Sequence, residues 1–160
     1  MIDIFDNRIE KVKEIFEEII NLPYYYGETD NLDSYPTGMV SELNKNHQAY
    51  QELLKFCKKE NLLSKLKINR AYVNIFAPSE NANYHVDSDQ DNYKTILYYP
   101  HLDFNINEGG ETKFVSGNNT LVSILPIPGR IIVFNSNLKH TASPFKNKHR
   151  FSIAVKLIDN

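Results

Sequence analysis

The second half of the chain is a succession of short β-forming segments, and this order of elements restricts the fold most strongly. Val, Ile, Tyr, Phe and Thr are frequent in these segments, and Gly, Pro, Asn or Asp residues separate most of them. They lie at residues 67–76, 83–87, 93–99, 111–115, 120–125, 130–134, 138–142 and 149–158. Because they do not alternate with helices as βαβ units, the sheet is expected to be largely antiparallel. The sequence therefore predicts a double-sheet jelly roll or barrel.

Two helices are predicted before these segments. Residues 6–21 place apolar side chains at the i, i+3, i+4, i+7 spacing of an amphipathic helix, with Asp6 as its expected N-cap. Residues 24–38 have no such period and predict a loop or an irregular strand. A second helix is expected from about 46 to 61, and its apolar face consists of Tyr50, Leu53, Leu54 and Cys57. We expect both helices to brace one sheet from outside.

The length of 160 residues suits one domain that buries about two-thirds of its unfolded surface. We expect helical support over about residues 1–65 and the β core over about 66–158. The formal net charge of −2 gives no electrostatic reason to expect nucleic acid or an anionic membrane as a partner. No apolar run approaches the ~20 residues of a membrane span, and residues 1–6 lack the basic start of a secretory signal. A cytoplasmic location is expected, and the oligomeric state stays open.

Metal-binding side chains occur among the β segments. His85 and Asp87 are two residues apart, and a strand turns residues i and i+2 to the same face, so both can point at one ion. His140 supplies a second imidazole, and Arg150 follows ten residues later. Two histidines and one carboxylate with open positions are the ligand set of non-haem Fe(II) oxygenases. An isolated His-X-Asp is more often the solvent face of a strand, so the order of the other motifs matters.

That order resembles the 2-oxoglutarate/Fe(II)-dependent dioxygenase superfamily, specifically its prolyl 4-hydroxylase-like branch with small phage and bacterial members. The resemblance covers roughly residues 70–158 and also includes the turn Gly109-Gly110-Glu111-Thr112. It implies a mainly β (α+β) domain built on a double-stranded β-helix of the jelly-roll, cupin-like type. It further implies that His85, Asp87 and His140 are the Fe(II) ligands and the catalytic residues.

The resemblance also implies a binding site for the co-substrate 2-oxoglutarate. Arg150 matches the basic residue that binds the far carboxylate, and a planar guanidinium can hold a carboxylate by two parallel hydrogen bonds. Ser152 shares the strand face of Arg150, and Leu97 would line the same pocket. Tyr99 resembles the family tyrosine that donates its phenol to this carboxylate. A register shift of one residue would exchange Tyr99 for Tyr98.

The implied activity is hydroxylation of an unactivated C–H bond, with O₂ as a second co-substrate and with decarboxylation of 2-oxoglutarate to succinate and CO₂. The expected substrate is a peptidyl residue, with proline as one candidate, or a small molecule. A non-catalytic cupin-like metal-binding module is one alternative, which Arg150 and Tyr99 disfavour because a structural metal needs no carboxylate clamp. A nucleic-acid base demethylase is the other, and it would require a basic groove that the sequence does not indicate.

The remaining chemically capable residues are expected to be structural. Cys57 fits the apolar face of the second helix, His47 lies near the start of that helix, and His149 faces away from Arg150. His101 is expected to be structural, with a substrate contact as the alternative. Substrate contacts are expected mainly in residues 24–38 and 79–84.

Overall fold

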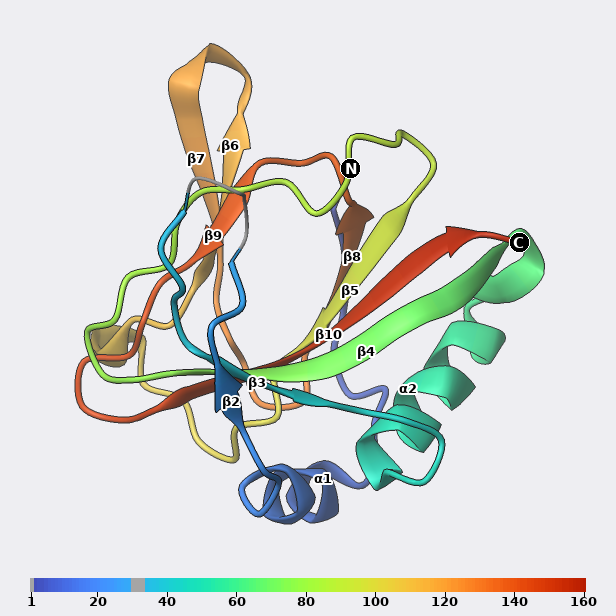
Figure 1. Ribbon diagram of the computed structural model, residues 1–160, viewed down its shortest axis with the longest axis horizontal. Coiled ribbons are helices and arrows are strands. Elements are labelled where there is room, and N and C mark those ends of the chain that lie inside the picture. The colour runs from blue at the N-terminus through green and yellow to red at the C-terminus, as the bar shows by residue number, and fades with distance from the viewer. Residues whose placement is uncertain (1, 30–33) are drawn as a thin grey trace.

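The computed structural model describes residues 2–29 and 34–160 and consists of two antiparallel sheets that face each other (Figure 1). The large sheet has the order β1 (Ile2–Phe5), β8 (Ile131–Asn135), β5 (Lys94–Tyr98), β10 (Arg150–Asp159), β4 (Leu66–Phe76), β3 (Met39–Glu42) and β2 (Tyr25–Tyr26). The small sheet has the order β7 (Thr120–Ile124), β6 (Thr112–Ser116) and β9 (His140–Ala142). The predicted antiparallel jelly roll is confirmed.

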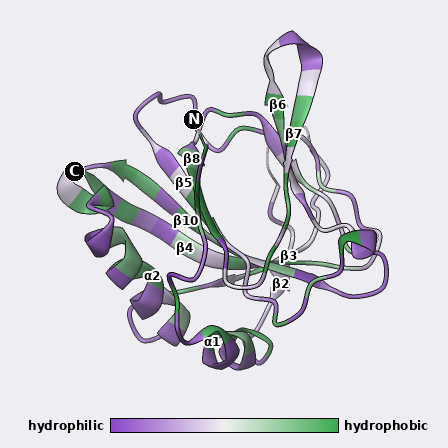
Figure 2. Cartoon of the chain, turned by 180° about the vertical axis from the view of Figure 1, so that it is seen from behind, coloured by the Kyte–Doolittle hydropathy of each residue, from purple (hydrophilic) through white to green (hydrophobic). Residues whose placement is uncertain are grey.

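Both helices lie on the outer side of the large sheet, as expected (Figure 1). They are α1 (Val12–Ile19) and α2 (Gln48–Lys59). Ile15, Ile19 and Leu53 pack in one buried cluster with side chains of the sheet such as Val73 and Ile153. Figure 2 shows the hydrophobic strand segments that lie beside these helices. No described helix is long and apolar enough to cross a membrane.

The first helix begins later than predicted. Residues Ile2–Phe5 form β1, which pairs with β8, and α1 begins only at Val12. The predicted N-cap is also wrong, because the carboxylate of Asp6 accepts hydrogen bonds from Nε and Nη2 of Arg130 at 2.8 and 2.9 Å. Helical periodicity could not show this, since the pairing partner of β1 lies about 130 residues away in the sequence.

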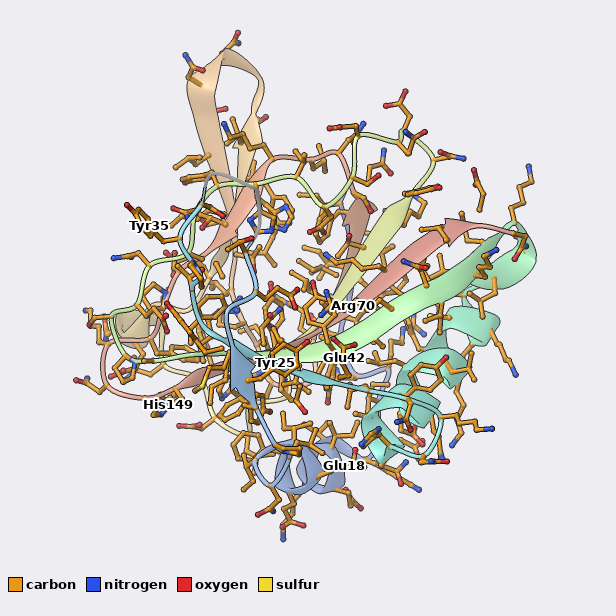
Figure 3. The ribbon with its side chains drawn as sticks, in the orientation of Figure 1. Glu18, Tyr25, Tyr35, Glu42, Arg70 and His149 are labelled. Atoms are coloured by element: carbon orange, nitrogen blue, oxygen red, sulfur yellow. The ribbon has the colours of Figure 1, made fainter. Side chains whose placement is uncertain are left out.

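The second helix matches its prediction closely, but its buried face is different. It is shorter by two residues at each end, and Tyr50 and Leu54 are only partly buried. The buried residues are Ala49, Glu52, Leu53, Phe56 and Cys57. The amides of Gln48 and Ala49 at its N-terminus donate to the Glu18 carboxylate of α1 at 2.8 and 2.9 Å. A negative charge at a helix N-terminus is favourable, so this contact fixes α2 against α1 (Figure 3).

The strand predictions need correction in two respects. Residues 83–87 do not form a strand, and only His85 makes an isolated bridge, which pairs it with His140. Strands β1 and β3 were not predicted. Residues 24–38, predicted as a loop or an irregular strand, contain the short strand β2, and residues 30–33 lie outside the described residues.

Alternation along β10 decides which side chains face the space between the sheets. Ile153, Val155 and Leu157 pack in the cluster under the helices. The side chains on the opposite face of β10 point to the other sheet and line a cavity, and they are Arg150, Ser152, Ala154 and Lys156. One strand therefore contributes to both the core and the candidate site.

Candidate active site

The three predicted metal ligands meet at one point between the sheets. The His85 amide donates to the His140 carbonyl and the His140 amide donates to the His85 carbonyl, both at 2.9 Å, which holds the two imidazoles side by side. Their ring centroids are 4.5 Å apart. Asp87 is held by its amide, which donates to the Ser136 carbonyl at 2.8 Å. One ligand atom from each of the three side chains lies within 4.8 Å of the others.

Hydrogen bonds orient both imidazoles for metal binding. Nδ1 of His85 lies 3.1 Å from the Asn83 carbonyl oxygen, and Nδ1 of His140 lies 2.8 Å from the Leu138 carbonyl oxygen. A carbonyl oxygen only accepts, so each Nδ1 carries the proton and each Nε2 keeps a free lone pair. Burial lowers the pKa of His140 to about 4, so this ring is neutral at pH 7. Both rings thus present the donor atom that a divalent metal requires.

The two carboxylate oxygens of Asp87 have different contacts, and Oδ2 lies 3.9 Å from Nε2 of His140. Oδ2 accepts hydrogen bonds from Oγ1 of Thr95 and from Nζ of Lys156, each at 2.5 Å. Oδ1 lies 3.5 Å from Nε2 of His85. Burial acts to raise the pKa of Asp87, but His85, Lys156 and His140 together lower it below the ordinary value, so the group is a carboxylate. Two imidazoles and one carboxylate fit a divalent iron ion.

The triad lies at the wall of a cavity between the sheets, and Arg150 lines the same cavity. The Arg150 side chain is buried, with 1% exposure. Its Nε donates to the Gly110 carbonyl at 2.9 Å, Nη1 to the Ser152 hydroxyl at 3.1 Å and Nη2 to the Thr112 hydroxyl at 3.0 Å. These partners are neutral, and within residues 2–29 and 34–160 no carboxylate forms an ion pair with Arg150. Burial accordingly lowers the pKa of Arg150 below its ordinary value.

Tyr99, and not Tyr98, lies on the side of Arg150. The Tyr99 hydroxyl donates to Thr112 Oγ1 at 2.7 Å, and its ring centroid is 5.7 Å from the Arg150 guanidinium carbon. Tyr98 packs under the helices, and its buried hydroxyl has no hydrogen-bond partner among the described residues. Leu97 lines the cavity, as predicted. Thr112 lies at the cavity wall, accepting hydrogen bonds from both Tyr99 and Arg150.

Sequence reasoning assigned no role to Thr112, Thr95 or Lys156. The signal for Lys156 is its position on β10, an even number of residues after Arg150, which places both on one strand face. Thr112 belongs to the Gly-Gly-Glu-Thr turn, whose residue Gly110 has φ +85°. A Cβ at Gly110 would lie 2.2 Å from the Phe145 ring, so only glycine fits where its carbonyl meets Arg150.

The other histidines and the cysteine lie where a structural role was expected. Nε2 of His101 accepts the Phe151 amide proton at 2.9 Å, and burial, aided by the charges of Lys148 and Arg150, lowers its pKa to about 4. His149 is exposed (Figure 3). Cys57 is buried, and burial raises the pKa of its thiol to about 12.

The jelly roll carries two imidazoles and a carboxylate on one wall of a cavity, with open space on the other side. This combination defines a mononuclear non-haem iron oxygenase. Residues 71–155 match the 2OG-Fe(II) oxygenase superfamily. The chain belongs to this superfamily and is a 2-oxoglutarate/Fe(II)-dependent dioxygenase. Its Fe(II) site is the triad of His85, Asp87 and His140, and 2-oxoglutarate is its co-substrate, as in the family.

Solved structures with a similar fold include prolyl hydroxylases. A prolyl-4-hydroxylase of Pseudomonas putida is 13% identical with a TM-score of 0.76, and the alignment covers 99% of this chain and 92% of that one. A Trichoplax adhaerens prolyl hydroxylase, solved with a hypoxia-inducible-factor peptide fragment, is 18% identical with a TM-score of 0.76, covering 99% and 83%.

A third similar structure is HygX from Streptomyces hygroscopicus, solved with nickel, 2-oxoglutarate and hygromycin B. It is 11% identical with a TM-score of 0.73, and the alignment covers 99% of this chain and 83% of that one. No curated protein sequence matches the chain. At these identities the three structures establish the shared fold.

Proposed function

We propose that residues 1–160 form a single domain that hydroxylates an unactivated C–H bond of a peptidyl residue or a small molecule. In this reaction one oxygen atom of O₂ enters the substrate as a hydroxyl group. The other enters succinate, which forms together with CO₂ from 2-oxoglutarate. The observation that carries the proposal is a buried cation with neutral partners in the same cavity as the metal triad.

The triad residues are the proposed catalytic residues. Bound Fe(II) would supply the activation of O₂, and the protein would supply ligand orientation and exclusion of water. His85 and His140 would bind through Nε2 because their Nδ1 atoms are held by backbone carbonyls. Asp87 would bind through Oδ1, which lies 3.5 Å from Nε2 of His85, because Oδ2, although 3.9 Å from Nε2 of His140, already accepts two hydrogen bonds. Three ligands on one side leave three positions of a six-coordinate ion for co-substrates.

Arg150 is the proposed partner of the far carboxylate of 2-oxoglutarate. A buried charge is costly unless it is paired, and the neutral hydrogen-bond partners of Arg150 do not neutralise it. An anion in the cavity would do so. The Ser152 and Thr112 hydroxyls beside the guanidinium can donate to the same carboxylate, with Tyr99 holding Thr112 in place and Leu97 forming an apolar wall.

The charges near the triad argue against a nucleic-acid substrate. Arg70 lines a second cavity beside His85 and Asp87. Its guanidinium donates to Glu28 at 2.6 and 2.7 Å and to Glu42 at 2.5 and 3.0 Å (Figure 3). This cluster has one positive and two negative charges, and it offers no attraction to a polyphosphate backbone.

Peptide and small-molecule substrates both have a structural precedent. The Trichoplax enzyme was solved with a peptide fragment and HygX with hygromycin B, and both share the fold of this chain. The chain has Phe76 in its cavity wall where family members commonly have tyrosine, which weakens any transfer of proline specificity. A reducing cytoplasm, which keeps iron in the Fe(II) state, is the proposed compartment.

An anaerobic reconstitution tests this proposal. The purified protein is mixed with Fe(II) and 2-oxoglutarate, and we expect a weak visible charge-transfer band and, after admission of O₂, succinate. Metabolite and peptide libraries are then screened for products heavier by one oxygen atom. Thermal stabilisation by a divalent metal with neither the band nor succinate would favour the non-catalytic metal-binding module instead.

A further inference from the structure

A lysine lies directly beside the metal triad. Lys156 is on the same face of β10 as Arg150, six residues further along the strand, so the two cations are about 20 Å apart along the backbone. Strand pairing with β4 shifts register between Lys156 and Leu157. The side chain of Lys156 is 19% exposed and lines both the cavity of Arg150 and the second cavity next to the triad.

Lys156 contacts the iron ligand Asp87 and also Tyr72, whose ring centroid lies 5.8 Å from Nζ. Nζ lies 2.5 Å from Oδ2, and the Thr95 hydroxyl donates to the same oxygen. Thr95 is itself buried and lies 3.1 Å from the Ser136 hydroxyl oxygen. Oδ2 accepts from two donors on β5 and β10 and lies 3.9 Å from Nε2 of His140, whereas Oδ1 lies 3.5 Å from Nε2 of His85. The carboxylate presents its two oxygens to two different environments.

A carboxylate can bind a metal through one oxygen or through both. If both oxygens of Asp87 bound iron, they would occupy one of the three positions that the co-substrates need.

The charge of Lys156 has a second effect. Iron, Asp87 and Lys156 together carry a formal charge of +2, against +1 without the lysine, and 2-oxoglutarate is a dianion.

We propose that Lys156 is a positioning residue that keeps Asp87 bound to iron through Oδ1 alone and strengthens the binding of 2-oxoglutarate. This inference rests on the proposed function. Lys156 acts through Asp87 and through its charge. A lysine that served only as a counter-ion for folding would change the stability of the protein and leave 2-oxoglutarate affinity unchanged.

Three substitutions separate these roles. Lys156→Met removes the charge and the donor while keeping an unbranched apolar side chain, and Lys156→Arg keeps both. Thr95→Val is the neutral comparison, because it removes the uncharged donor to the same oxygen and leaves the lysine in place. Calorimetry measures Mn(II) affinity and then the affinity of the Mn(II)-loaded protein for 2-oxoglutarate. The visible spectrum of the Co(II)-loaded protein reports the coordination number of the metal.

For Lys156→Met we expect Mn(II) affinity within about threefold of the wild type, 2-oxoglutarate bound about tenfold more weakly, and a changed Co(II) spectrum. Lys156→Arg should recover most of the 2-oxoglutarate affinity. Thr95→Val, which removes a donor to the same oxygen but no charge, should weaken 2-oxoglutarate binding less than Lys156→Met does. If Lys156→Met does not fold, Lys156→Gln, which removes the charge but keeps a donor, takes its place.

Wild-type 2-oxoglutarate affinity together with an unchanged Co(II) spectrum in the lysine variant would overturn the inference. So would a parallel loss of Mn(II) binding and thermal stability without a selective effect on 2-oxoglutarate, since that result identifies a structural counter-ion. Failure of the wild-type protein to bind 2-oxoglutarate would instead refute the proposed function, and the two failures are therefore distinguishable.

Discussion

Replacing Arg150 by methionine should abolish most of the affinity for 2-oxoglutarate and leave metal binding nearly intact. Methionine keeps much of the buried volume but removes the charge and the donors to Ser152, Thr112 and Gly110. Truncating one partner of a buried charge pair costs about 2 to 5 kcal/mol. Because the two hydroxyls remain as donors, we take the lower value, and about 2 kcal/mol corresponds to roughly 30-fold weaker binding.

The same magnitude can be read from thermal unfolding. At a 2-oxoglutarate concentration 100 times the wild-type Kd, bound ligand stabilises the metal-loaded wild type by about 2.7 kcal/mol. A variant with 30-fold weaker binding gains only about 0.9 kcal/mol at that concentration. The two proteins are compared by the stabilisation that 2-oxoglutarate adds to each of them. Their ligand-free stabilities are not compared, because the substitution has two opposite effects on that stability. Loss of the donor to the Gly110 carbonyl is destabilising, whereas removal of a buried charge is stabilising.

The assay is calorimetric titration of 2-oxoglutarate into the Mn(II)-loaded protein, checked by this thermal increment. His149→Met is the matched control, because His149 adjoins Arg150 but is exposed, and we expect wild-type affinity for it. A 2-oxoglutarate Kd within threefold of the wild type for Arg150→Met would refute the assignment of Arg150 as the carboxylate partner.

Three further predictions concern single side chains. His85→Ala should abolish metal binding and succinate formation, whereas His149→Ala should keep both; succinate from the first variant would contradict the triad. Tyr99→Phe should weaken 2-oxoglutarate binding about three- to tenfold in calorimetry. Tyr98→Phe should not lower the free energy of unfolding, because it removes a buried hydroxyl that has no hydrogen-bond partner among the described residues. Because His101 has its folded pKa lowered from 6.5 to about 4, its contribution to stability is complete above pH 6.5 and is lost as pH falls toward 4. His101→Gln should flatten this decline, which is on the order of 3 kcal/mol, in denaturant unfolding measured across that range; an unchanged slope would reject the prediction.

Local patterns were sufficient for most of the elements. Runs of β-forming residues separated by Gly, Pro, Asn or Asp identified the strands of the core, and the period of 3.6 identified both helices, because these signals depend only on neighbours in the sequence. Strands β1 and β3 were missed, since four residues carry too weak a pattern and their pairing partners lie far away in the sequence. The wrong cap assignment at Asp6 has the same cause, because Arg130 becomes its neighbour only when β1 joins β8.

The sequence by itself determined the succession of short strands that is typical of a jelly roll and the shared strand face of Arg150 and Ser152. The triad residues were identified by residue type and by the resemblance of the motif order to the family, whereas strand alternation does not account for them, because residues 83–87 do not form a strand. Only the tertiary structure decided that Thr112 connects the Tyr99 hydroxyl to Arg150, and that Thr95 and Lys156 donate to one oxygen of Asp87. The physical reason is that these contacts join different strands, and the register of antiparallel pairing between distant segments is set by the packing of the whole domain.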